Sequence, residues 1–166
     1  MNRALAVVSG GGLIAAITWH LVVLIGRELP RSVWLVLFVG VFVVWVPAVI
    51  ALVPLRSKIQ ELGGLKGTMA MFAGAPLWMS YGALLALGYA VINFILGAGM
   101  VGGSVSDDHP AFQRVASGHS IAFYAAAMAI LHAAAGRADP PRCLNGHRLA
   151  AGESRCRECG AALISS

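Results

Sequence analysis

Long apolar stretches separated by short polar segments are the dominant pattern along this chain. Residues 32–55, 67–106 and 115–136 contain no charged side chain. Each stretch is mostly apolar and at least about 20 residues long, which is the length that crosses a ~30 Å hydrocarbon core as a helix. The pattern therefore predicts an all-α protein whose helices span a membrane.

Four spanning helices fit this pattern, over residues 4–26, 32–55, 71–98 and 117–136, and together they define a transmembrane domain over 1–137. The first apolar run is too long for the hydrophobic region of a signal peptide. It also lacks a small-x-small cleavage site followed by a polar mature sequence. We therefore expect it to remain in the protein as a helix.

The uncharged stretch from 67 to 106 is too long for one simple span and lacks the polar turn that two spans would need. We expect a short interfacial segment at 67–74, followed by a helix with Pro76 in its first turn, where proline is tolerated. A cluster of glycines then ends this helix, namely Gly97, Gly99, Gly102 and Gly103.

Small residues recur at helical spacing in three of the expected spans. Lipid tails provide no hydrophobic reason for helices to associate, so close packing of small residues and polar contacts must do so. The stripes are Ala125, Ala129 and Ala133, and Gly118, Ala122 and Ala126, in the fourth span; Gly82, Ala86 and Ala90 in the third; and Gly11 with Ala15, and Gly12 with Ala16, in the first. Asn93, deep in the third span, is expected to hydrogen-bond to a neighbouring helix.

The composition supports a membrane protein. Hydrophobic residues make up 58% of the chain, charged residues only 11%, and the mean hydropathy is +0.79, whereas soluble domains carry about 25% charged residues. The net charge of +5 does not indicate a nucleic-acid partner, because basic residues of membrane proteins mark cytoplasmic loops and contact anionic lipid. The lipid bilayer is the partner that this composition predicts.

The basic residues also predict an orientation. Of the 12 Lys and Arg residues, nine fall on the side of the N-terminus and three on the other. The nine are Arg3, Arg56, Lys58, Lys66, Arg137, Arg142, Arg148, Arg155 and Arg157, and the three are Arg27, Arg31 and Arg114. This bias predicts a multi-pass protein of a bacterial-type inner membrane with both termini in the cytoplasm. Asp107 and Asp108 would then lie in an outer loop with Arg114.

The last 24 residues contain the sharpest chemical signal. All three cysteines of the chain lie there with a histidine, as Cys143, His147, Cys156 and Cys159. Two pairs of ligands at this spacing are typical of a zinc site, and four protein ligands leave no position for water, which makes the site structural. Asn145-Gly146 suits the first turn, and Gly160 suits the positive φ that often closes the second.

This run resembles the small zinc ribbons found at the ends of many bacterial proteins, of the form C-x-N-G-H…C-x-x-C-G. The resemblance covers residues 142 to 164 and implies that Zn²⁺ is bound by the four residues just named. It implies a fold and a metal but no activity. We expect a short β-hairpin within 148–155, a third strand over 161–164, and Pro140-Pro141 as a stiff part of a linker over 138–142, so that the ribbon occupies 143–166.

Two other interpretations of the tail are weaker. A disordered tail with coincidental cysteines does not explain why spacing, turn residues and flanking glycine agree. A redox dithiol at Cys156 and Cys159 would need a βαβ context, which is missing from this sequence. The arginines beside the site, Arg148, Arg155 and Arg157, can balance the negative charge of three thiolates around Zn²⁺.

Histidines within the spans suggest a second kind of site. His20 and His119 would both lie toward the outer leaflet and could pair across one haem or metal ion, although hydrogen-bonded structural roles are simpler. His119 and His132 lie on nearly opposite faces of one helix, so a stacked pair of haems, and haem in general, is disfavoured. His109 could join Asp107 and Asp108 at a metal, or belong to a solvated turn.

No nucleophile elbow, phosphate loop, HExxH motif or pair of intramembrane carboxylates occurs, so an enzyme is disfavoured. The leading hypothesis is an interaction, regulatory or accessory protein whose cytoplasmic zinc ribbon binds a protein partner. The alternative is a subunit of a membrane redox or transport complex with His20 and His119 near a cofactor. A small transporter is a third hypothesis, which the lack of an internal repeat weakens.

Overall fold

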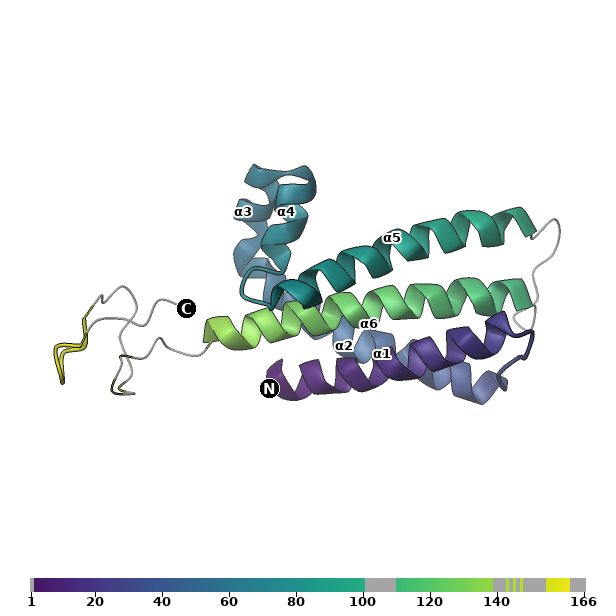
Figure 1. Cartoon of the computed structure of the whole chain (residues 1–166), viewed down its shortest axis with the longest axis horizontal. Helices are drawn as coiled ribbons and strands as arrows, with labels where there is room; N and C mark the ends of the chain where they lie inside the picture. The colour runs from purple at the N-terminus through teal and green to yellow at the C-terminus, as the bar shows by residue number, and fades with distance from the viewer. Residues whose placement is uncertain are drawn as a thin grey trace.

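The computed structural model describes residues 2–100, 110–138, 143, 145, 147 and 155–161, with the side chains of 98–100 and 138 excepted. Its helices are α1 (Asn2–Leu24), α2 (Arg31–Leu52), the 3₁₀ turn η1 (Val53–Leu55), α3 (Arg56–Leu62), α4 (Gly64–Met71), α5 (Leu77–Met100) and α6 (Pro110–Ala138). Figure 1 shows the long helices α1, α2, α5 and α6 side by side, with α3 and α4 as a short hairpin that projects from one end of the bundle.

The prediction of four long apolar helices is confirmed. Four helical stretches are long and apolar enough to cross a membrane: Asn2–Leu24, Arg31–Leu62, Leu77–Gly97 and Pro110–Arg137. Expected and observed boundaries differ most at the fourth helix, which begins at Pro110 and not at residue 117. The added turns are stable because Pro110 occupies the first helical position and the polar side chains that follow it find partners in the bundle.

The end of α1 follows from a single glycine. Gly26 has φ of 78°, its N–H donates to Val23 O at 3.0 Å, and the N–H of Arg27 donates to Val22 O at 3.1 Å. This pair of bonds is a Schellman motif, which satisfies carbonyl groups that the helix end would otherwise leave open. The chain therefore leaves α1 in a fixed direction and reaches Pro30, directly before α2.

The hairpin of α3 and α4 replaces the expected interfacial segment at 67–74. Gly63 and Gly64 have φ of 58° and 45°, and this left-handed turn reverses the chain. Gly67 is buried, and a Cβ added to it would lie 2.6 Å from the Ile59 carbonyl oxygen, so only glycine allows the two helices to pack this closely. Pro76 lies directly before α5, and its carbonyl accepts bonds from Met79 and Ser80.

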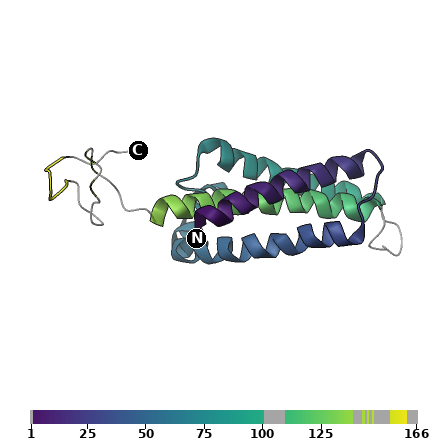
Figure 2. The ribbon, with the colours of Figure 1, turned by 90° about the horizontal axis from the view of Figure 1, so that it is seen from below.

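α6 is the central helix of the bundle. Within its most apolar stretch 72% of the residues are buried, compared with 28%, 17% and 22% in the most apolar stretches of the other three candidate spans. The other three long helices pack around it (Figures 1 and 2). Its predicted alanine stripes are confirmed as buried contact surfaces, and the residues concerned are Ala122, Ala125, Ala126, Ala129 and Ala133.

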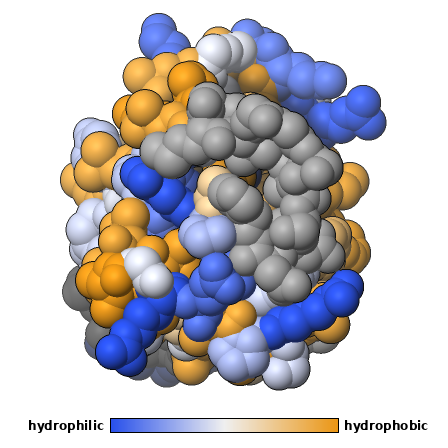
Figure 3. All heavy atoms as spheres, turned by 90° about the vertical axis from the view of Figure 1, so that its right-hand side faces the viewer, coloured by the Kyte–Doolittle hydropathy of each residue, from blue (hydrophilic) through white to orange (hydrophobic). Residues whose placement is uncertain are grey.

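Both ends of the described chain, and the α3–α4 hairpin, lie at one end of the bundle (Figure 1). The opposite end carries the link between α1 and α2, where Arg27, Glu28 and Arg31 are exposed. Figure 3 looks onto this second end and shows hydrophilic residues around its rim, with hydrophobic residues along the flanks. The helices thus run up and down, as four consecutive spans with both termini on one side would.

Tyr124 of α6 fills the space between α1 and α2. Its ring lies against Gly12 of α1 and its hydroxyl against Gly40 of α2, at positions where a Cβ would overlap the tyrosine. The hydroxyl donates to Leu37 O at 2.8 Å. The prediction that the Gly12 face of α1 allows close packing is therefore confirmed, whereas Gly11 faces open space.

The small-residue stripe expected on the third span is wrong in part. A Cβ added to Gly82 would meet no atom within 4 Å, and Gly82 is exposed. The buried small residues of α5 are Ser80, Ala83, Ala90 and Gly97. The physical reason is that α5 packs mainly on α6 and leaves the flank that contains Gly82 open.

Asn93 has the interhelical partner that the sequence predicted. Its Nδ2 donates to Arg114 O at 2.9 Å, and its Oδ1 accepts from Arg114 Nε at 3.3 Å. The expectation that Arg114 lies in an outer loop is wrong, because this pair of bonds holds the arginine within α6. The pair joins α5 to α6 near one end of the bundle.

Replacing Asn93 by alanine is expected to destabilise the bundle by about 0.6 to 1.7 kcal/mol, which are the average and the maximum measured for interhelical hydrogen bonds in a membrane protein. The measurement is the free energy of unfolding in detergent micelles. Ile92→Ala is the matched control, because Ile92 is the adjacent residue and is 57% exposed on the outside of α5. Equal losses in the two variants would contradict a role for the Asn93–Arg114 pair.

Candidate metal centre

The tail forms two short loops, and one hydrogen bond from a cysteine N–H closes each of them. The N–H of Cys143 donates to His147 O at 3.0 Å, and the N–H of Cys156 donates to Ala161 O at 2.9 Å. Within the second loop, the Gly160 N–H donates to Cys156 O at 2.8 Å. Gly160 has φ of 68°, so the expected positive φ is confirmed.

The two loops bring the four predicted ligands together. One donor atom from each of the four residues, Cys143, His147, Cys156 and Cys159, lies within 4.8 Å of the others. Cys143 Sγ lies 3.5 Å from Cys159 Sγ, and Cys156 Sγ lies 3.6 Å from His147 Nδ1. Each short contact joins one loop to the other, so a single ion between the loops could contact all four side chains.

The thiols differ in acidity. Desolvation acts to raise the pKa of Cys143, but hydrogen bonds that its sulfur receives from the Asn145 backbone and from Cys159 outweigh this effect, and the pKa falls to about 7. Burial raises the pKa of Cys156, against the effect of its backbone hydrogen bonds. Cys143 is therefore the more acidic of these two sulfurs, and thiolate is the form that binds metal.

Charged side chains surround the cluster on its outer side. Arg155, Arg157 and Glu158 are exposed, and a Glu158 carboxylate oxygen lies 3.6 Å from His147 Nδ1. Cys143 and Cys156 are buried. Two of the three cysteines are thus buried, and the surface around the cluster is polar and carries both signs of charge.

The strands of the expected ribbon are only partly tested. Within the described part of the tail, Cys143 and Arg155 each form an isolated β-bridge, and no strand is present. The linker prolines, Arg148, most of the expected hairpin and most of the third strand lie outside the described residues. So do Asp107, Asp108 and His109 of the second candidate metal site.

His20 has two partners that sequence reasoning missed. Its Nδ1 lies 2.8 Å from Ser117 Oγ, and its Nε2 is hydrogen-bonded to the Tyr89 hydroxyl. Ser117 Oγ itself donates to Gln113 O at 2.7 Å, which assigns Nδ1 of His20 as the donor and Nε2 as the acceptor. The lone pair that a haem iron would need is therefore engaged by Tyr89.

His119 lies in different surroundings. Ser117 and His119 are two residues apart on α6, which places them on roughly opposite faces of the helix, and His20 contacts the Ser117 face. His119 Nδ1 donates to Val115 O at 2.9 Å, so its lone pair is on Nε2. Its ring lines an aromatic groove of about 550 Å³ between α2, α5 and α6. Among the described residues, His20 and His119 thus have different partners and do not contact a common site.

His132 is exposed near the C-terminal end of α6. It lines a groove between α1 and α5 that Arg3 also lines. Sequence spacing could not have predicted which residues share this groove with His132, because the three helices that line it are distant in the chain.

No model of a known protein family matches the chain, and neither does any curated protein or solved structure. The likeness of the tail to zinc ribbons therefore rests on its four ligands and the geometry of its two loops.

Proposed function

We propose that this protein is a multi-pass inner-membrane protein whose cytoplasmic tail is a structural zinc ribbon that binds a protein partner, in a regulatory or accessory role. The observation that carries the proposal is the cluster of four donor atoms within 4.8 Å of one another. The same chain has four helices that are long and apolar enough to span a membrane. The helices would fix the protein in the bilayer, and the tail would be presented to soluble partners.

Zinc is the ion that best fits the donor set. Three thiols and one imidazole are a common structural zinc set, with Zn–S of ~2.3 Å and Zn–N of ~2.0–2.1 Å. A tetrahedron of these dimensions has edges of about 3.8 Å between sulfurs and about 3.6 Å between sulfur and nitrogen. The observed separations of 3.5 Å and 3.6 Å are close to these edges. Four protein ligands would leave no position for a reacting water.

The assignment of the tail to the cytoplasm rests on charge. The end of the bundle that carries both ends of the described chain also carries the basic hairpin residues Arg56, Lys58 and Lys66. The positive-inside rule places such an end in the cytoplasm. The reducing cytoplasm would also keep the three thiols available for metal.

A photocrosslinking amino acid tests partner binding directly. Placed at Glu158, whose side chain is 73% exposed, it is expected to yield a protein adduct in native membranes, and the adduct should be lost when Cys156→Ser is added. Placed at Val36, which is 70% exposed on the apolar flank of α2, it should yield no such adduct. Tail positions that give only lipid or water products would refute the partner-binding role.

A redox or transport subunit remains the second candidate, and one observation favours it. The Nε2 lone pair of His119 is available in a groove lined by Phe38, Phe42 and Phe94. An absorption spectrum of the purified protein with a Soret band that His119→Ala abolishes would assign a haem to this groove and replace the partner-binding proposal.

A further inference from the structure

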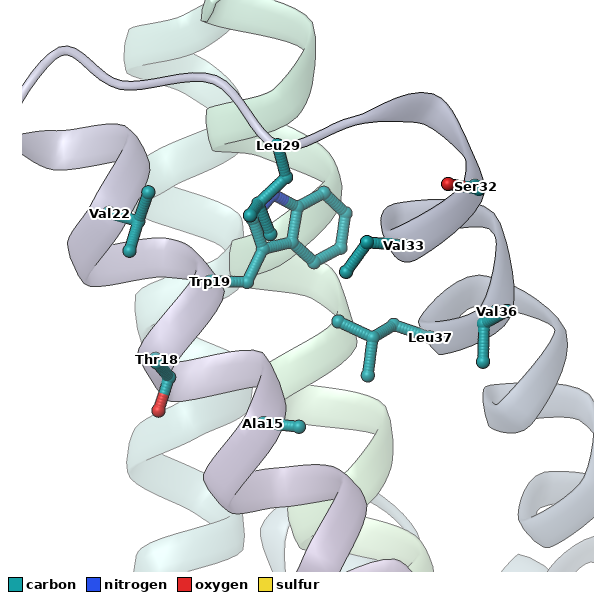
Figure 4. Close-up of a pocket in the computed structure, with 9 residues that line it drawn as sticks. All are labelled: Ala15, Thr18, Trp19, Val22, Leu29, Ser32, Val33, Val36 and Leu37. Carbon is teal, nitrogen blue, oxygen red and sulfur yellow. The ribbon is translucent and has the colours of Figure 1, made fainter.

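Grooves run along the surface of the described part of the bundle, and they differ in their polar residues. The groove between α1 and α2 has a volume of about 600 Å³ and no charged residue among those that line it. Figure 4 shows Trp19 and Leu37 pointing into it, with Val22 and Val33 at its sides. The acyl chains of bulk lipid can cover such an apolar surface without a specific headgroup contact. The groove between α1 and α5 is different, because it begins at charged and polar side chains.

Two adjoining cavities of about 550 Å³ and 190 Å³ make up the α1–α5 groove, and both are lined by Met79 and Met128. Along α1 the lining residues extend from Arg3 to Ile17. At 1.5 Å per residue this is about 21 Å, which exceeds the ~15 Å of one leaflet of the hydrocarbon core. The groove is therefore long enough for an extended acyl chain.

Small residues form much of the wall of this groove. Gly82 and Ala86 of α5 and Ala125 of α6 line its inner part, and the space beside Gly82 is open. Farther along the bundle, the hydrogen bond between His20 and Tyr89 joins α1 to α5. This hydrogen bond limits the groove at its inner end. The groove therefore opens toward the end of the bundle that holds the N-terminus.

The open end presents groups that recognise phosphate. Arg3 and His132 both line it, and a guanidinium group and an imidazole N–H each donate to phosphate oxygens. Trp78, at the start of α5, is 67% exposed and lines the adjoining cavity. Exposed tryptophan near the end of a spanning helix is typical of the boundary between headgroups and acyl chains.

We propose that the α1–α5 groove binds one anionic phospholipid, with its phosphate at Arg3 and His132 and one acyl chain beside Gly82. Basic pockets between spanning helices are known to bind anionic headgroups. A second copy of the chain fits less well, since a symmetric dimer through this groove would bring two basic ends together. The proposal requires that the four helices span a bilayer, and it is independent of partner binding by the tail.

Native mass spectrometry of the full chain in a nonionic detergent tests this site. An equimolar mixture of dioleoyl phosphatidylglycerol and dioleoyl phosphatidylcholine is added, and the ratio of the two adducts is measured. The wild type should retain phosphatidylglycerol preferentially, and Arg3→Gln should reduce this preference roughly fivefold, the effect of about one basic residue near anionic lipid. Lys58→Gln, which removes an exposed cation of the hairpin, should not.

Glycine variants test the acyl-chain half of the groove. Gly82→Leu should abolish both adducts because its side chain would fill the open space, whereas Gly88→Leu is the matched control. Gly88 is exposed on the same helix and also has open space beside it, but it does not line the groove. Both changes favour the helix, and an unchanged midpoint of thermal unfolding confirms that the variants fold.

Equal retention of the two lipids by the wild type would overturn the proposal, as would lipid adducts on Gly82→Leu that match those on Gly88→Leu. A dimer that Gly82→Leu dissociates, without bound lipid, would assign the groove to a second copy of the chain. None of these readouts depends on zinc or on a partner of the tail, so they separate this proposal from the proposed function.

Discussion

Replacing Cys156 by serine is expected to reduce bound zinc from one ion per chain to nearly none, and to unfold the tail. The described tail has two loops closed by single hydrogen bonds and a cluster of buried cysteines in place of a larger core. In segments of this size the metal provides the folding free energy, about 10 kcal/mol or more. Serine offers no thiolate, so this free energy is lost. Elemental analysis gives the zinc content, and limited proteolysis reports the unfolding.

Arg155→Ser is the matched control for this change. Arg155 precedes Cys156 in the same loop and is exposed, so its replacement should leave both the zinc content and the protease resistance unchanged. A wild-type protein without zinc would refute the metal centre, and so would a Cys156→Ser protein that retains a full equivalent of zinc.

Replacing Gly12 by valine is expected to destabilise the bundle by about 2 to 4 kcal/mol. The new Cβ would overlap the ring of Tyr124, and Tyr124 is only 3% exposed, so its ring has no free space to move into. If the ring shifts, its hydrogen bond to Leu37 O is lost as well. The midpoint and free energy of unfolding in micelles measure the effect.

Gly11→Val separates packing from backbone effects. Gly11 is the neighbouring residue on α1, it is exposed, and the space beside it is open. Valine is no worse than glycine for a helix, so this variant should be as stable as the wild type. If both valine variants lose stability equally, the contact between Gly12 and Tyr124 is not what limits the approach of α1 to α6.

The spans could be predicted because uncharged stretches of spanning length are a local property of the sequence. Their ends could not be predicted equally well. Arg114 looked like a loop residue because an isolated cation is expensive within a span, and its partner Asn93 lies on another helix. The open flank at Gly82 is a related case, because a small-residue stripe does not reveal whether a helix covers it.

The metal ligands could be predicted because each pair occupies one short loop, so their spacing alone brings them close together. The surroundings of His20 could not. Its partners Tyr89 and Ser117 are 69 and 97 residues away in the chain, and only the packing of α1 and α5 on α6 brings them together. Sequence reasoning could state that a histidine in a span needs partners, but not which ones.

The central position of α6 has a consequence for biosynthesis. Domains form from the N-terminus during synthesis, so α6 leaves the ribosome after the other three long helices. Its surface is rich in alanine, which favours membrane insertion less than the leucine, valine and phenylalanine of α2 do. We therefore expect the three earlier helices to form the surface on which α6 packs. Synthesis of the tail follows, so the metal loops emerge on a bundle whose last helix has already been made.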